Sequence, residues 1–378
     1  MSDRILYIVA LTALLVPMTN TVYNPNIPII QKDLNTTTQL IALTISAFTG
    51  VMALAQLIYG PISDRRGRRG ILLFGLLVYV ISSAAIYFSN DVYQLIILRA
   101  AQALGVSTGI VVGAAVLSDV YKKNLSNVMG TYQFVILIGP VIGPVIGGII
   151  ASLFGWRSIF LFLTLIGMIA FTIVYFFLKE TLKKVHKTHV MTSLKLLKDT
   201  PLFFVSLLGF ASLGTIYIFV TFFPIILNSY GIGVAMIGFA FLPSGIALLI
   251  GSKLGGKMTD KKGAKSVIVI GTIITIITTV AFAFFVHLNS LGLYYALAAY
   301  TLSGIGSGMF WTASRVYVVD RSHLKASANG AFNFMSFLGA TVALFVGSVV
   351  FEAFGVLMLF LSFALFMLLA LLPVIAKA

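Results

Sequence analysis

The sequence predicts an all-α membrane protein that crosses the lipid bilayer many times. Of its 378 residues, 60% are hydrophobic and only 9% are charged, with a mean hydropathy of +1.08. A soluble domain carries about 25% charged residues. Apolar runs of the roughly 20 residues needed to cross a bilayer recur along the whole chain, separated by short polar segments.

Twelve segments are long and apolar enough to be transmembrane helices: residues 5–28, 40–60, 71–88, 93–117, 128–152, 158–178, 202–227, 234–256, 267–287, 292–318, 327–350 and 354–375. The longest polar break divides them six and six. We therefore expect an N-terminal six-helix bundle at residues 1–178, a cytoplasmic linker at 179–200 and a C-terminal six-helix bundle at 201–378.

The distribution of positive charge predicts the orientation. The formal net charge is +15, and loops rich in Lys and Arg stay in the cytoplasm. When the segments alternate from a cytoplasmic N-terminus, 20 of the 25 Lys and Arg residues fall on the cytoplasmic side. We expect a multi-pass protein of the cell membrane with both termini in the cytoplasm. The charge then reflects topology, which disfavours nucleic acid as a partner.

The most polar stretch between two predicted spans reads GPISDRRGRRG and covers residues 60–70. Topology alone requires only its positive charge, so the acid and the glycines indicate a further role. A carboxylate here is suited to bind the unpaired N–H groups at a helix start, and the arginines to pair with acids such as Asp119. The expected gating residues are Gly60, Asp64, Arg65, Gly67, Arg68, Arg69, Asp119 and, in the repeat described next, Asp260.

A weaker copy of this stretch, GGKMTDKKGAK, covers residues 255–265. Asp260 follows Asp64 by 196 positions, about half the chain. One copy of this motif in each half predicts an internal repeat, with the two bundles related by pseudo-two-fold symmetry.

The fourth span contains a basic residue, Arg99, with Gln102 on the same helix face. Arg99 lies about seven residues into the span, roughly 10 Å, which leaves two interpretations. The side chain either snorkels to the outer headgroups or serves a polar cavity, and deep ionisable residues usually do the latter.

The fifth span carries small residues at regular spacing together with two prolines. Such a face lets two helices touch backbone to backbone, and proline permits a bend. The residues are Gly130, Gly139, Gly143, Pro144, Gly147 and Gly148.

These motifs resemble signatures of the major facilitator superfamily. Residues 60–70 resemble its cytoplasmic signature, residues around Arg99 its span-4 arginine motif, and the fifth span its antiporter signature. The resemblance implies the twelve-span drug:proton antiporter group, export by alternating access, and a latch in which the acid faces the start of the eleventh span near residues 325–328. It also implies a proton gradient as the energy source, with no cofactor.

Polar residues at helical spacing within the spans are the candidate substrate contacts. They are Asn20, Tyr23, Asn24, Arg99, Gln102, Tyr132, Gln133, Tyr217, Thr221, Ser307, Trp311, Asn329 and Asn333. All ten acids of the sequence fall at predicted span ends or in loops, whereas many relatives have an acid in the first span. Any proton site is therefore expected at Asp64 and Asp119, or at a water near Arg99.

The sequence contains no catalytic constellation, metal cluster or phosphate-binding loop, so we expect neither an enzyme nor a metalloprotein. The favoured function is proton-driven export of small amphipathic, drug-like compounds by a monomer in the lipid bilayer. Two alternatives remain at this stage. One is export of a polar metabolite such as an amino acid or a sugar, and the other is a lipid flippase or a non-transporting sensor.

Overall fold

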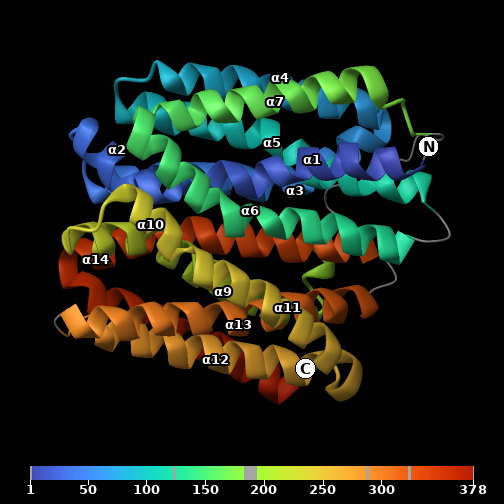
Figure 1. Ribbon diagram of the computed structural model, residues 1–378. Helices are drawn as coiled ribbons and strands as arrows, with labels where there is room; N and C mark the ends of the chain where they lie inside the picture. The colour runs from blue at the N-terminus through green and yellow to red at the C-terminus, as the bar shows by residue number, and fades with distance from the viewer. Residues whose placement is uncertain are drawn as a thin grey trace. The chain divides into compact units, whose positions relative to one another are not determined.

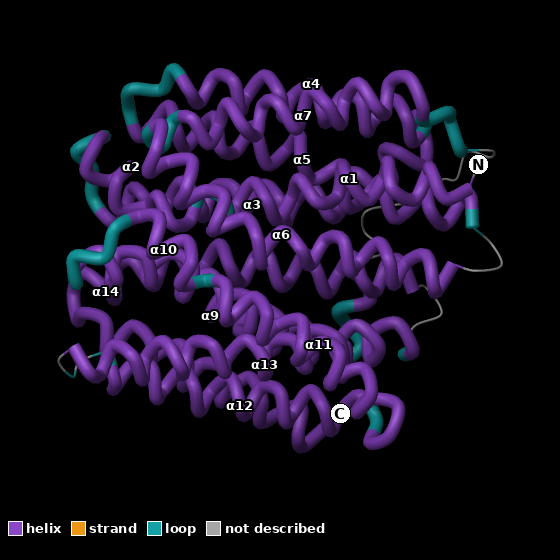
Figure 2. Tube along the Cα trace, in the orientation of Figure 1, coloured by secondary structure: helices purple, strands orange, loops and turns teal. Residues whose placement is uncertain are grey.

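The computed structural model describes residues 2–121, 125–182, 194–286, 288, 290–321 and 325–377. Over these ranges the regular structure is helical throughout and contains no strand (Figure 2). Most of the predicted linker, residues 183–193, lies outside the described ranges, as do the side chains of residues 325–327.

Except between Phe177 and Thr200, the helices follow one another with short connections (Figure 1). The first half contains α1 (Ser2–Thr21), the 3-10 turn η1 (Asn24–Asn26), α2 (Ile27–Asp33), α3 (Thr38–Arg66), α4 (Arg68–Tyr87), α5 (Val92–Val120), α6 (Leu125–Phe154) and α7 (Ser158–Phe177). The second half contains α9 (Thr200–Ser229), α10 (Val234–Ala240), α11 (Leu242–Lys262), α12 (Ala264–Phe285), α13 (Ser290–Asp320) and α14 (Lys325–Lys377).

Each of the twelve predicted spans is helical in the structure. Within the described ranges, ten helical segments are long and apolar enough to cross a membrane. The last of them, in α14, combines two predicted spans, because Gly355 has a non-helical backbone (φ 76°, ψ −174°) that divides the helix. α13 coincides with the predicted span at 292–318.

The chain forms two compact units. Unit 1 comprises Met1–Val190 and Pro224–Phe239, and unit 2 comprises Met191–Phe223 and Ala240–Ala378. In unit 1, α5 packs against α1, α3 and α4, and α4 also packs against α7. In unit 2, α13 packs against α11 and α12 in the same way that α5 packs against α3 and α4.

The predicted repeat is visible in the turn between the third and fourth helices of each half. α3 ends at Arg66 and α4 begins at Arg68, while α11 ends at Lys262 and α12 begins at Ala264. Gly67 between the first pair has φ 96° and ψ 151°, and Gly263 between the second has φ 79° and ψ 153°. Because L side chains rarely adopt such a φ, the same backbone turn explains a glycine at both positions.

A second feature repeats beside each turn. The Arg69 guanidinium donates to the Tyr175 carbonyl oxygen near the end of α7, at 2.7 Å. The Lys265 ammonium, 196 positions later, donates to the Ile375 carbonyl oxygen near the end of α14, at 3.2 Å. In each unit a basic side chain therefore binds a carbonyl group that the helix end leaves unpaired.

Candidate functional site

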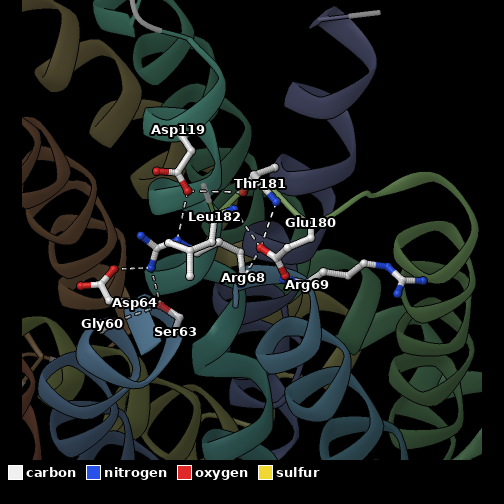
Figure 3. A network of polar contacts seen from close by, with 9 residues as sticks. All are labelled: Gly60, Ser63, Asp64, Arg68, Arg69, Asp119, Glu180, Thr181 and Leu182. Carbon is white, nitrogen blue, oxygen red and sulfur yellow. Dashed lines mark hydrogen bonds and ion pairs between the residues drawn. The ribbon is translucent and has the colours of Figure 1, made fainter. Parts of the chain in front are cut away.

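One end of unit 1 carries a polar network centred on the Arg68 side chain (Figure 3). Its guanidinium lies 2.5 Å from an Asp64 carboxylate oxygen and 3.1 Å from Asp119 Oδ2, and it donates to Ser63 Oγ at 2.7 Å. Arg68 is buried, with only 6% of the residue exposed. We call Ser63, Asp64, Arg68 and Asp119 the Arg68 network. A single cation thus serves two carboxylates on different helices, α3 and α5.

A third acid, Glu180, lies beside this network and was absent from the sequence-based candidates. It accepts hydrogen bonds from the backbone N–H groups of Arg68 at 2.9 Å and Arg69 at 3.1 Å. These are the first two residues of α4, so Glu180 caps a helix from which it is distant in sequence. The available signal was an acid directly after a predicted span, and sequence alone does not show which helix start it reaches.

Glu180 also accepts from the backbone N–H groups of Thr181 and Leu182, both at 2.9 Å. Partial burial, the largest single influence, raises the pKa of the Glu180 carboxyl group. The four N–H donors together outweigh that effect, so the pKa of Glu180 lies below its ordinary value. Glu180 is therefore a carboxylate at neutral pH.

The helix-start role predicted for Asp64 is filled within unit 1 by Glu180, whereas Asp64 pairs with Arg68. The predicted partner of Asp64, the helix start near residues 325–328, belongs to unit 2, and most of its side chains lie outside the described residues. Arg65 and Asp260 are exposed. A Cβ atom on Gly60 would meet no described atom within 4 Å, so the described contacts do not require a glycine there.

Arg99 is completely buried in unit 1, at 0% exposure. Its guanidinium donates to Gln102 Oε1 at 2.9 Å, to Asn20 Oδ1 at 3.0 Å and to the Thr19 carbonyl oxygen at 3.4 Å. It also lies over two aromatic rings, 4.5 Å from the centroid of Tyr23 and 4.4 Å from that of Phe48. These contacts place the charge among α1, α3 and α5, so in this structure Arg99 does not snorkel.

The polar cluster extends beyond Arg99. Gln102 Nε2 donates to Ser83 Oγ at 2.8 Å, and the Tyr23 hydroxyl lies 2.8 Å from Thr44 Oγ1. Within unit 1, Arg99 therefore joins the predicted candidates Asn20 and Gln102 by hydrogen bonds and Tyr23 through the face of its ring.

The glycines of α6 pack against α1 and the turn that follows it. A Cβ atom on Gly139 would lie 2.8 Å from Pro17 Cγ, one on Gly143 would collide with Thr21 Oγ1, and one on Gly147 would collide with the Val22 carbonyl oxygen. Thr21 Oγ1 donates to the Gly139 carbonyl oxygen at 3.0 Å.

Two other glycines of this motif differ from that group. Gly148 faces α10, where a Cβ atom would lie 2.8 Å from the Val234 carbonyl oxygen. Gly130 is exposed, and a Cβ atom there would meet no described atom within 4 Å. Close packing therefore does not account for Gly130. Pro140 and Pro144 both lie inside the helix, as the sequence suggested.

Among the remaining candidates, Tyr132 has a structural contact. Its hydroxyl group lies 3.2 Å from the Gly109 carbonyl oxygen and 3.1 Å from that of Ile110, which joins α6 to α5. Asn24 in unit 1 and Thr221 in unit 2 are buried, and neither Asn24 Oδ1 nor Thr221 Oγ1 has a hydrogen-bond partner among the described residues. Buried oxygens without partners are costly, which makes these two suited to receive a ligand.

The other candidates are distributed between the units. Gln133 on α6 is half-buried in unit 1. In unit 2, Trp311 packs edge-to-face against Phe310 and Phe332, with ring centroids 5.5 Å and 5.6 Å away. Ser307 is buried on α13, and Tyr217, Asn329 and Asn333 are half-buried. These candidates therefore belong partly to unit 1 and partly to unit 2.

The positions of the acidic residues agree with the sequence analysis, which placed all ten at span ends or in loops. All ten lie within three residues of a helix end or, for Glu352, of the break at Gly355. Among the described residues, no group of three or more His, Asp or Glu side chains is arranged to hold a metal ion.

Comparison with known proteins defines the class. The family model described as Major Facilitator Superfamily matches residues 9–344. The chain therefore belongs to this superfamily: it is a multi-pass membrane transporter for small molecules and not an enzyme.

Individual relatives agree with this assignment. The chain is 28% identical over 264 residues to a bicyclomycin resistance protein homolog of Haemophilus influenzae, covering 68% of this chain and 66% of that one. It is 30% identical over 255 residues to a chloramphenicol resistance protein of Pseudomonas aeruginosa, covering 66% and 60%. The matches thus span slightly less than two thirds of either relative. A citrate exporter of Aspergillus niger is 31% identical over 179 residues, covering 47% of this chain and 34% of that one.

Solved structures share the fold at low sequence identity. A nucleoside transporter matches with a TM-score of 0.80 and 14% identity, covering 99% of both chains. A D-xylose–proton symporter matches with a TM-score of 0.78 and 15% identity, covering 97% of both chains.

Proposed function

We propose that this transporter exports small amphipathic compounds by alternating access and that an inward proton gradient drives it. The observation that carries the proposal is the glycine face of α6, which meets α1 at Gly139 and Gly143 and the turn after α1 at Gly147. This face carries the signature that resembles antiporters. Relatives named for resistance to bicyclomycin and chloramphenicol support export of such compounds.

The Arg68 network offers a route for coupling at the predicted cytoplasmic end. Arg68 bonds Asp64 and Asp119 together, and protonation of either acid would remove one charge that it balances. A proton arriving at this network would then weaken the connection between α3, α4 and α5. The ends of these helices are where the proposed latch opens and closes.

The Arg99 cluster is the proposed polar part of the substrate pathway within unit 1. A charge within the span costs up to about 2.5–3.5 kcal/mol on insertion scales at the helix centre and less nearer the interface, so the retention of Arg99 calls for a function. Asn24, with a buried oxygen lacking a described partner, lies on the same stretch as Asn20 and Tyr23. We propose that a substrate binds near these residues when the unit is accessible.

The purified transporter in liposomes with an imposed pH gradient tests the proposal. Radiolabelled chloramphenicol is the probe, and liposomes without protein are the control. We expect accumulation that depends on the gradient and collapses when an ionophore removes it. Uptake that is equal with and without the gradient would contradict proton-driven transport.

Export of a polar, carboxylate-bearing metabolite is the second candidate function. A buried arginine is suited to bind a carboxylate, and the match to a citrate exporter favours the same chemistry. Radiolabelled citrate in the same liposomes distinguishes the two. Gradient-dependent accumulation of citrate without chloramphenicol would favour this alternative.

A further inference from the structure

Glu180 links two segments that are distant in sequence. Its carboxylate accepts from Arg68 N and Arg69 N at the start of α4, and from Thr181 N and Leu182 N in its own segment. The first N–H groups of a helix have no partner within the helix, and a negative charge is favoured there. Figure 3 shows the carboxylate between these donors, next to the Arg68 side chain.

Gly67 provides the space that the carboxylate occupies. A Cβ atom at Gly67 would lie 2.6 Å from Glu180 Oε2, and the positive φ independently disfavours any other residue. Gly263 has the same backbone conformation in unit 2, yet a Cβ atom there would meet nothing within 4 Å among the described residues. The carboxylate at the turn is therefore a feature of unit 1 beyond the shared repeat.

Among the described residues, two side chains donate to Asp119, and both belong to residues whose backbone N–H groups bind Glu180. Arg68 Nε donates to Asp119 Oδ2 at 3.1 Å, and Thr181 Oγ1 donates to the same oxygen at 3.3 Å. The backbone N–H groups of Arg68 and Thr181 are each bound by Glu180. Glu180 thus fixes the main chain from which both donors extend.

We propose that Glu180 is a positioning residue that aims Arg68 and Thr181 at Asp119 and so sets how readily the Arg68 network is released. The inference rests on the proposed alternating-access function. It adds that the segment after α7, which leads into the linker between the two halves, acts on the network through Glu180. Movement of Glu180 toward the linker would withdraw both donors of Asp119 together.

The chain contains no cysteine, so a labelled pair introduces the only two thiols. Arg66→Cys and Lys261→Cys provide sites for spin labels at the ends of α3 and α11. Double electron–electron resonance then measures the distribution of distances between the two labels in the full-length protein. The variants are Glu180→Gln, Glu180→Asp, Asp119→Asn and the double variant Glu180→Gln/Asp119→Asn. Asp320→Asn, an exposed acid at the end of α13, is the matched control.

We expect Glu180→Gln to change the ratio of the two distance populations about fivefold, the effect of removing a charge at a helix start. Glu180→Asp retains the charge, so its distance ratio should lie between those of the wild type and Glu180→Gln. Asp320→Asn should resemble the wild type. The double variant should shift no further than Asp119→Asn, because both changes act on one contact. A single cooperative unfolding transition in Glu180→Gln, even at a lower temperature than in the wild type, would separate this effect from misfolding.

A shift with Asp119→Asn but none with Glu180→Gln would overturn the positioning role and leave the latch intact. Additive shifts in the double variant would also overturn it, because Glu180 would then act elsewhere. No shift in either single variant would overturn both the latch and the role of Glu180. Substrate accumulation in liposomes, measured on the same samples, tests the proposed export separately.

Discussion

Arg68 is the residue on which the two acids of the network depend, since its guanidinium bonds both Asp64 and Asp119. Asp64→Asn removes one charge while retaining the size of the side chain. We expect weaker closure at the predicted cytoplasmic end and a reduction in transport of about tenfold, equivalent to 1.4 kcal/mol. The folded protein should be retained, because Asp64 is not deeply buried.

Distance measurements between the α3–α4 and α11–α12 turns check this expectation. Lys257→Gln, which changes an exposed residue of α11, is a suitable control. If the distribution of distances in Asp64→Asn were identical to that of the wild type, Asp64 would have no latching role.

Arg99 is completely buried in unit 1 and donates to three oxygens through its guanidinium group. We expect Arg99→Ala to abolish transport while the protein still inserts into the membrane. Arg99→Lys retains the charge but loses the planar fork, so we expect partial activity at most. A transport assay with a membrane-insertion control measures both. Wild-type transport by Arg99→Ala would mean that the arginine has no role in the substrate pathway.

The pKa of Glu180 is lowered in the folded protein, so the stability contributed by this residue should depend on pH. Such a group contributes stability that is present above its unfolded pKa, about 4.3, and is lost as the pH falls through the lower folded pKa. The difference in unfolding temperature between wild type and Glu180→Gln should therefore be constant from about pH 8 to pH 5.5. A difference that disappears within that interval would show that Glu180 titrates there and would contradict its assignment as a fixed carboxylate.

Individual residues differed in how well sequence could predict them. The pairing of Arg68 with Asp119 was anticipated because both residues stand at helix ends with opposite charge. Glu180 was missed because its partners are backbone N–H groups 111 and 112 positions away, which carry no sequence signal. The burial of Arg99 over Tyr23 and Phe48 likewise depends on how three helices meet.

At the scale of elements, α6 provides a comparison within one motif. Gly147→Ala places a methyl group against the Val22 carbonyl oxygen, whereas Gly130→Ala places one in open space. We expect Gly147→Ala to impair transport and to cost about 1–3 kcal/mol of stability through overpacking, and Gly143→Leu and Gly147→Leu to impair transport more severely. Gly130→Ala should be silent.

Transport rates and thermal unfolding of the Gly147→Ala and Gly130→Ala variants check this contrast. Equal behaviour of the two would mean that the contact between α6 and α1 has no part in transport.

The predicted spans agree with the helices in position but not in length. The second span was predicted at residues 40–60 from hydropathy, and the helix that contains it, α3, runs from Thr38 to Arg66. Hydropathy detects only the part of a helix in hydrocarbon, while the backbone hydrogen bonds continue until Gly67 ends the helix. The joining of two spans in α14 also lies beyond a hydropathy pattern, because the break rests on the backbone of Gly355.

At the scale of the whole molecule, the internal repeat was predictable because glycines and acids mark the same turn twice. The turns at Gly67 and Gly263 confirm it in backbone geometry. The grouping of Pro224–Phe239 with unit 1 was not foreseen, since it follows from packing of α10 on α6 near Gly148. Contacts of this kind depend on the fold and not on local sequence.

Coupling between proton and substrate is the central claim, and the reverse reaction tests it most directly. In liposomes without an imposed pH gradient, a pH-sensitive dye inside reports protons while a chloramphenicol gradient drives the drug inward. We expect the interior to become alkaline with the wild type, because protons leave as the drug enters, and to keep its pH with Asp64→Asn/Asp119→Asn. Inward transport of chloramphenicol by the wild type without any change in internal pH would contradict proton-coupled export.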